Sequence, residues 1–119
     1  MSVMQEFFLA YGADYDKTMR RFMGNEALYH RLLPKLFQDN TLQKLGEALA
    51  TNNWKCAFEA AHTLKGVVAN LGLTPLYDAV CVIVEPLRKQ EYGADYQALY
   101  QAIQKELERV SALWTQLEK

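Results

Sequence analysis

The stretch AAHTLKGVVANLGL, at residues 60–73, decides the fold of this chain. It consists mainly of small and aliphatic residues, and we predict an α-helix that ends at Gly72. At about 100° per residue, the apolar side chains of this helix gather on one face, made of Ala57, Ala60, Leu64, Val67, Val68 and Leu71. The opposite face holds His62, Lys65, Gly66 and Ala69. We therefore predict that the histidine points into water.

Gly66 is unusual in such a helix, because an interior glycine costs roughly 1 kcal/mol relative to alanine. It follows His62 by one turn and removes a side chain that would crowd the imidazole. A helix–helix contact that needs a small residue is an equally good explanation of Gly66 alone, and Lys65 alone would be a solvated surface lysine. Together, a reactive imidazole, a nearby cation and a cleared approach favour the transfer of a phosphoryl group.

The segment AHTLKGVVANLGL resembles the signature of histidine-containing phosphotransfer (HPt) domains. The resemblance is densest over residues 53–73 and weaker from Tyr15 to Glu118. It implies an all-α fold, an antiparallel four-helix bundle with a short additional N-terminal helix. It also implies that His62 is phosphorylated as the carrier of a multistep two-component phosphorelay. The length of 119 residues fits one such domain spanning residues 1–119.

The resemblance also implies how the partner is recognised. The expected partner is the receiver domain of a response regulator or a hybrid histidine kinase, which supplies the aspartate and Mg²⁺. We expect this chain to be a monomer with no cofactor and no metal ligand of its own. It has no Gly-rich nucleotide loop, so we expect a carrier and not an ATP-dependent kinase. Charge stabilisation is expected from Lys65, and the residues expected to bind the partner are Lys55, Phe58, Glu59 and Ala69.

One departure from the family concerns the orientation of His62. Many members place a glutamine or another polar residue on the following helix, where it orients the histidine. The corresponding positions here are Val84 and Glu85. If Val84 faces His62, that hydrogen bond is missing, and Glu85 or Asn70 is the expected replacement.

The composition of the chain argues against several other classes of function. Half of the residues are hydrophobic, and the net charge of −1 gives no electrostatic basis for binding nucleic acid or an anionic membrane. No apolar run approaches the ~20 residues that span a bilayer, and MSVMQEFFLAYG is a poor signal peptide, so we expect a cytoplasmic protein. Cys56 and Cys81 show no metal or redox spacing, and we interpret them as reduced, small apolar residues.

The other helices are predicted from apolar periodicity, at about 15–23, 26–38, 41–50, 75–90 and 96–117. The first residues are expected to pack loosely on the bundle, and Pro34 is expected to kink or break its helix near Leu33. The predicted N-caps are Asp14, Asn25, Asn53 and Thr74, the last with a proline at the first helical position. His30 is predicted to be a surface histidine.

Two other classes of function stay open at this point. One is a degenerate HPt fold that docks partners without chemistry. The other is a metal-binding helical bundle with His62 as a ligand, which would need Glu-x-x-His pairs that face inward. Glu59 and His62 form one such pair, but the sequence contains no second pair, and His62 is predicted to face outward.

Overall fold

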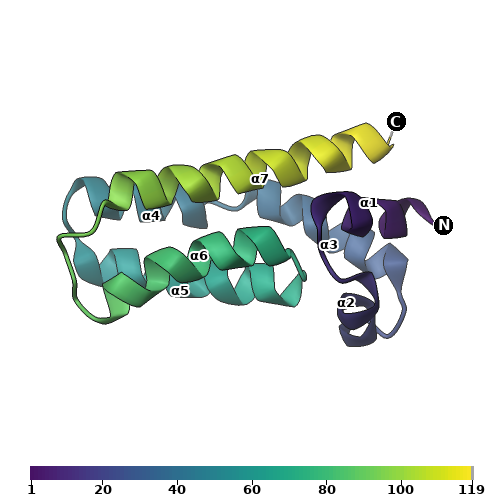
Figure 1. Cartoon of the computed structure of the whole chain (residues 1–119), viewed down its shortest axis with the longest axis horizontal. Helices are drawn as coiled ribbons and strands as arrows, with labels where there is room; N and C mark the ends of the chain where they lie inside the picture. Colours follow the sequence, from purple (N-terminus) through teal and green to yellow (C-terminus); the bar gives the residue numbers. More distant parts are fainter. Residues whose placement is uncertain (119) are drawn as a thin grey trace.

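The computed structural model describes residues 1–118, and these form seven helices and no strand. The elements are α1 (Val3–Tyr11), α2 (Tyr15–Arg21), α3 (Glu26–Gln38), α4 (Thr41–Ala50), α5 (Trp54–Asn70), α6 (Thr74–Arg88) and α7 (Tyr96–Glu118). Figure 1 shows α4, α5, α6 and α7 side by side as a bundle, with α5 and α6 antiparallel and α7 spanning the length of the molecule. The predicted all-α antiparallel bundle is confirmed.

The core of the bundle is built from the apolar stripes of its helices. Leu45 of α4, Leu64 of α5, Val80 of α6 and Ile103 of α7 are almost completely buried. In α7, the buried residues Tyr96, Ile103, Val110 and Trp114 are spaced by seven, seven and four residues, and partly buried residues such as Leu99 and Leu107 lie between them on the same apolar stripe, as the periodicity of the sequence predicts. This packing fixes which side of each helix remains available to solvent.

The N-terminal segment differs from the prediction. Residues 3–11 form the regular helix α1, which begins with a capping box between Ser2 and Gln5. Phe7 and Phe8 are fully buried, and the ring of Phe7 lies edge-on against Trp114 of α7, with ring centroids 5.3 Å apart. The expected loose packing is wrong, because the aromatic face of α1 becomes buried once α7 lies beside it.

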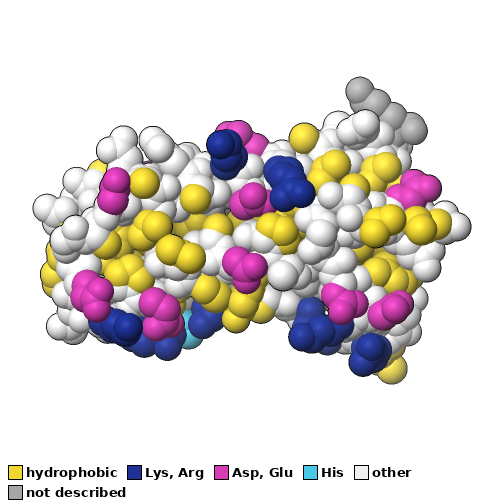
Figure 2. All heavy atoms as spheres, in the orientation of Figure 1, with side chains coloured by type: hydrophobic (Ala, Val, Ile, Leu, Met, Phe, Trp, Pro, Cys, Tyr) yellow, Lys and Arg dark blue, Asp and Glu magenta, His cyan; other side chains and the backbone are white. Residues whose placement is uncertain are grey.

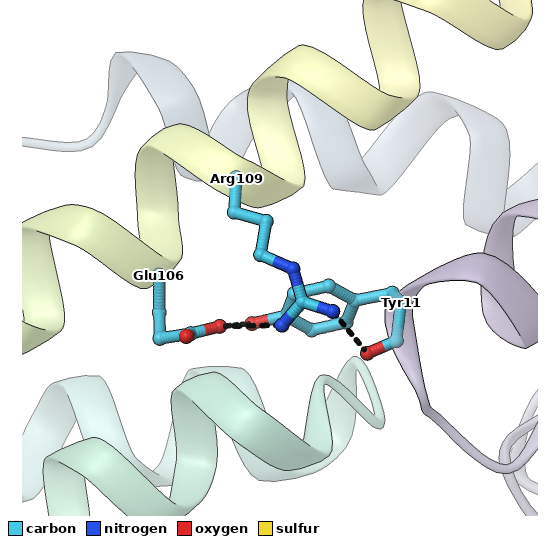
Figure 3. Close-up of polar contacts among 3 residues, drawn as sticks. All are labelled: Tyr11, Glu106 and Arg109. Carbon is cyan, nitrogen blue, oxygen red and sulfur yellow. Dashed lines mark hydrogen bonds and ion pairs between the residues drawn. The ribbon is translucent and has the colours of Figure 1, made fainter.

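A polar contact also joins α1 to α7, as Figure 3 shows. The Tyr11 hydroxyl donates a hydrogen bond of 2.8 Å to Glu106, and the Arg109 guanidinium lies 4.8 Å from the centre of the Tyr11 ring. Arg109 also forms an ion pair of 3.3 Å with Glu106. Burial, and then the hydrogen bond to Glu106, raise the pKa of Tyr11, so its hydroxyl remains a donor. The N-terminal helices are therefore attached to α7 by specific contacts.

One predicted helix boundary is confirmed and another needs correction. Helix α3 runs from Glu26 through Pro34 to Gln38 as predicted, so of the kink or break expected near Leu33, the break does not occur. Thr74 was predicted to cap α6, but it is the first helical residue and makes no capping hydrogen bond, and Pro75 follows it. The reason is the tight turn at Gly72, which brings Leu73 into the position that precedes the helix. The other three predicted caps, Asp14, Asn25 and Asn53, accept their capping hydrogen bonds.

Candidate phosphotransfer site

Helix α5 carries the candidate site, and both of its ends are defined by local sequence. At its start, the Asn53 side chain accepts a hydrogen bond from the Cys56 amide at 3.3 Å. At its end, Gly72 adopts a left-handed conformation with φ of 66°. The Gly72 amide donates to the Ala69 carbonyl, and the Leu73 amide donates to the Val68 carbonyl. These two bonds form a Schellman motif, which ends the helix as the glycine predicts.

The two faces of α5 have the predicted character. Ala57, Ala61, Leu64 and Val68 are buried against the rest of the bundle. His62 is exposed, and so is the backbone at Gly66 one turn later. The prediction that the histidine points away from the apolar face is confirmed.

The immediate surroundings of His62 leave its ring accessible. A Cβ atom built on Gly66 would have no atom of another part of the chain within 4 Å, so a partner can approach over that position. On the preceding turn, the Phe58 ring lies parallel to the imidazole, with centroids 5.7 Å apart and planes 10° apart. Lys65 is half-buried and follows His62 by three residues, which places it on the same face.

Within residues 1–118, no side chain forms a hydrogen bond with the His62 imidazole. Val84 is fully buried and supplies no polar group. Glu85 pairs with Arg88 on its own helix at 3.6 Å, and neither Glu85 nor Asn70 forms a hydrogen bond with His62 within residues 1–118. The replacement expected from Glu85 or Asn70 is therefore not observed. The aromatic ring that lies parallel beside the imidazole is that of Phe58, on the preceding turn of α5.

The other predicted partner-binding residues lie around this site. Lys55 and Glu59 are exposed on α5, and Ala69 is half-buried. The Ala69 carbonyl accepts a hydrogen bond of 2.9 Å from the guanidinium of Arg21, which belongs to α2. Sequence analysis missed Arg21, because 48 residues separate it from Ala69 and no local pattern connects the two.

The second histidine and the cysteines lie elsewhere. His30 has a side-chain exposure of 57%, as predicted for a surface histidine, and it pairs with Glu118 while its ring contacts Trp114. Cys56 and Cys81 are free thiols, as expected of reduced cysteines, but Cys56 is exposed and so does not serve as a small apolar packing residue. Asn53 as N-cap places Cys56 on the first turn of α5, on the side toward α4, where solvent reaches it.

The described part of the chain offers no support for a metal-binding site. In residues 1–118, no three His, Cys, Asp or Glu side chains lie together in a group that could hold a metal ion. A groove of about 580 Å³ between α4 and α5 contains Lys44, Glu47, Cys56 and Glu59, which is a mixed and open set of groups. Over the same residues, we found no helix with both the length and the hydrophobicity needed to span a membrane.

Comparison with protein families identifies this arrangement. A family model described as the Hpt domain matches residues 37–113, which include His62 and the whole of α4, α5 and α6. The chain belongs to the Hpt domain family. Members of this family take part in histidine phosphotransfer in two-component signalling, and they interact with receiver domains and histidine kinases. The Hpt match begins at the end of α3, so α1 and α2 lie outside it. Searches of curated proteins and of solved structures gave no match.

Proposed function

We propose that His62 is the phosphorylated residue of a phosphocarrier. It accepts a phosphoryl group from the aspartyl phosphate of one receiver domain and passes it to another. The observation that carries this proposal is an exposed imidazole with an open approach over Gly66, on the central helix of an Hpt domain. A degenerate Hpt domain that only docks partners would not need both features.

The chemical step is a reversible exchange between two acceptors. A neutral imidazole nitrogen attacks phosphorus, the N–P bond forms, and the P–O bond to the aspartate breaks. The aspartate leaves as a carboxylate, and the proton of the imidazole is released to solvent. Transfer to the next receiver reverses these steps. Such a transfer needs positioning and charge stabilisation more than covalent assistance, and this chain's residues would supply both.

Each neighbouring residue has a proposed role. The ammonium group of Lys65 meets the phosphoryl oxygens as charge develops on them, and Lys55 adds positive charge on the preceding turns. Gly66 leaves room for the aspartyl phosphate. Phe58 limits the rotation of the imidazole through its parallel contact and offers an apolar edge to the partner. Glu59 and Ala69 complete the proposed partner-binding residues.

We further propose that residues 1–119 act as one monomeric domain with no cofactor of its own, and that the receiver supplies Mg²⁺. The contacts of α1 with α7 support the inclusion of the N-terminal helices. The free thiols of Cys56 and Cys81 are compatible with the reducing cytoplasm that we propose as its location. Phosphate would enter from a receiver and not from ATP, because the chain lacks a Gly-rich nucleotide loop.

The test uses the two histidines as a matched pair. The protein is incubated with each phosphorylated receiver domain from the same cell, and labelled phosphate on the chain is followed in time. We expect an acid-labile, base-stable phosphate on the wild type and on His30→Gln, and none on His62→Gln. Equal labelling of the wild type and His62→Gln would show that His62 is not the acceptor. Stable binding of receivers without any labelling would favour the docking module.

A further inference from the structure

Helix α2 reaches the face of α5 that carries His62, although it lies outside the family match. Its Arg21 donates from Nη2 to the Ala69 carbonyl at 2.9 Å. Ala69 follows His62 by seven residues, about two turns, so both lie on the same face and about 10 Å apart along the helix axis. The guanidinium of Arg21 is therefore close to the surface on which a partner must sit to reach His62.

The size of a protein interface decides whether Arg21 falls inside it. A partner of ordinary size covers about 800 Å² on each side, which corresponds to a disc of about 16 Å in radius. A receiver centred on His62 would thus extend beyond Ala69 and over the end of α5. Since the reacting aspartate must lie over His62, the partner has little freedom to avoid this region.

A groove lies at this position, between α2, the end of α5 and the start of α6. Its volume is about 340 Å³, and its charged lining residues are Asp14, Lys17 and Arg21 from α2 and its cap, and Asp78 from α6. The Asp14 carboxylate already accepts from the Lys17 amide as the cap of α2. None of these four residues takes part in an ion pair within residues 1–118. Figure 2 shows basic side chains along this lower edge, below α5 and α6 and over α2, with acidic ones between them.

The Arg21 guanidinium keeps most of its donors available. Arginine has five N–H donors in a planar fork that matches a carboxylate, and the bond to Ala69 uses one nitrogen. The side chain is exposed, but the bond holds its position, so less rotamer entropy is lost on binding. A site that combines a reactive aspartate with Mg²⁺ is built from carboxylates, so the partner's face is acidic.

We propose that Arg21 is a docking residue for the receiver domain, and that it binds a carboxylate beside the phosphoaspartate site. This proposal rests on the proposed function of His62. Because α2 is outside the family match, the contact would add to the common docking surface of Hpt domains and help to select the partner. A competing explanation is that Arg21 only stabilises the C-terminal end of α5, where a cation interacts favourably with the helix dipole.

The experiment compares Arg21→Gln and Arg21→Lys with the matched control Arg20→Gln, whose side chain is on the same helix but does not line the groove. The probe is the phosphorylated receiver that transfers fastest to the wild type. We expect Arg21→Gln to raise KM about fivefold or more at low salt with little change in kcat, and to weaken the salt dependence of transfer. Arg21→Lys should recover part of the loss, and Arg20→Gln should stay within about twofold of the wild type.

A small phosphodonor distinguishes a docking role of Arg21 from a purely structural role. Phosphoramidate needs no protein interface, so we expect it to label His62 at the same rate in the wild type and Arg21→Gln, with only a small decrease in melting temperature because the bond to Ala69 is exposed. Transfer from the receiver within about twofold of the wild type in Arg21→Gln would overturn the docking role. An equal slowing with phosphoramidate and the receiver would also overturn it, in favour of a structural role. If no donor labels the wild type at His62, the proposed function itself fails.

Discussion

The four-helix region from α4 to α7 and the N-terminal region from α1 to α3 hold α5 in different ways. The first packs α5 along its length through buried side chains such as Ala61 and Leu64. The second meets its C-terminal end, where the buried Tyr29 hydroxyl donates to the Leu71 carbonyl at 2.6 Å and Arg21 donates to Ala69 at 2.9 Å. Burial raises the pKa of Tyr29, which keeps its hydroxyl a donor. The difference indicates that a region outside the family match positions the end of the reactive helix.

The largest loss of stability is expected from a substitution that weakens the packing of the N-terminal region. Phe7→Ala empties a fully buried space between α1 and α7, and should lower the free energy of unfolding by about 3–5 kcal/mol in a urea titration. The matched aromatic change Phe58→Ala should cost less stability, because Phe58 is half-buried, but it should slow phosphotransfer. If folded Phe7→Ala lost transfer as strongly as Phe58→Ala, the packing of α1 on α7 would matter to the site as much as the aromatic neighbour of His62 does.

A substitution at Gly72 tests the contact between the end of α5 and Thr18 of α2. A side chain there must adopt a left-handed backbone, and its Cβ would collide with Thr18 of α2. Gly72→Ala should therefore reduce the free energy of unfolding by about 2–4 kcal/mol. The control is Gly12→Ala, which shares the positive φ but has open space around it, and should cost about 1–2 kcal/mol. Equal losses would mean that the close approach of Thr18 adds no strain.

Removal of the polar contact between α1 and α7 should cause a smaller loss of stability. Tyr11→Phe keeps the ring beside Arg109 and removes the hydrogen bond to Glu106. We expect a loss of about 1 kcal/mol in unfolding free energy, measured by thermal and urea melts, with no change in transfer. Tyr92→Phe, at an exposed tyrosine, should change stability by less than about 0.5 kcal/mol. Reduced transfer in Tyr11→Phe would show that the contact between α1 and α7 also affects the site on α5.

A larger side chain at position 66 should slow phosphotransfer without lowering the stability of the fold. Gly66→Gln removes a helix-weakening glycine, and should leave stability unchanged or raise it by up to about 1 kcal/mol. The longer side chain should obstruct the aspartyl phosphate and slow transfer, followed as a time course from one phosphorylated receiver. Gly66→Ala serves as the control, since a methyl group meets no neighbouring atom and should slow transfer far less. Wild-type rates in Gly66→Gln would leave Gly66 without a role in access.

The smallest change in stability is expected for Lys65→Ala, at about 0.5 kcal/mol or less. Transfer should nonetheless slow, or the lifetime of phosphohistidine should change, because the ammonium group no longer meets the phosphoryl oxygens. A denaturant melt and a transfer time course measure the two effects. Lys105→Ala, at an exposed lysine of α7, should change neither. Unchanged kinetics and lifetime in Lys65→Ala would leave Lys65 as an ordinary surface residue.

Local sequence was sufficient to predict most of the four-helix region. The cap at Asn53 and the helix end at Gly72 depend on hydrogen bonds within a few residues, so their signals are readable from the chain itself. The exposure of His62 follows from the same logic, because helical periodicity separates it from the apolar face. The lack of a hydrogen bond from Glu85 to His62 was not predictable in this way, since it depends on how α6 packs, which buries Val84 and leaves Glu85 paired with Arg88.

By itself, the sequence determined the helices of the bundle, the outward face of α5 and the open approach beside His62, because these depend on helix period and on residues within two turns. The tertiary structure alone decided that α1 is buried, that Arg21 meets Ala69, and that Thr18 lies against Gly72. Each of these facts joins segments far apart in the chain, and no local preference selects one distant partner over another. That choice is made when the apolar faces pack together, because burial is non-directional and shape decides which residues meet.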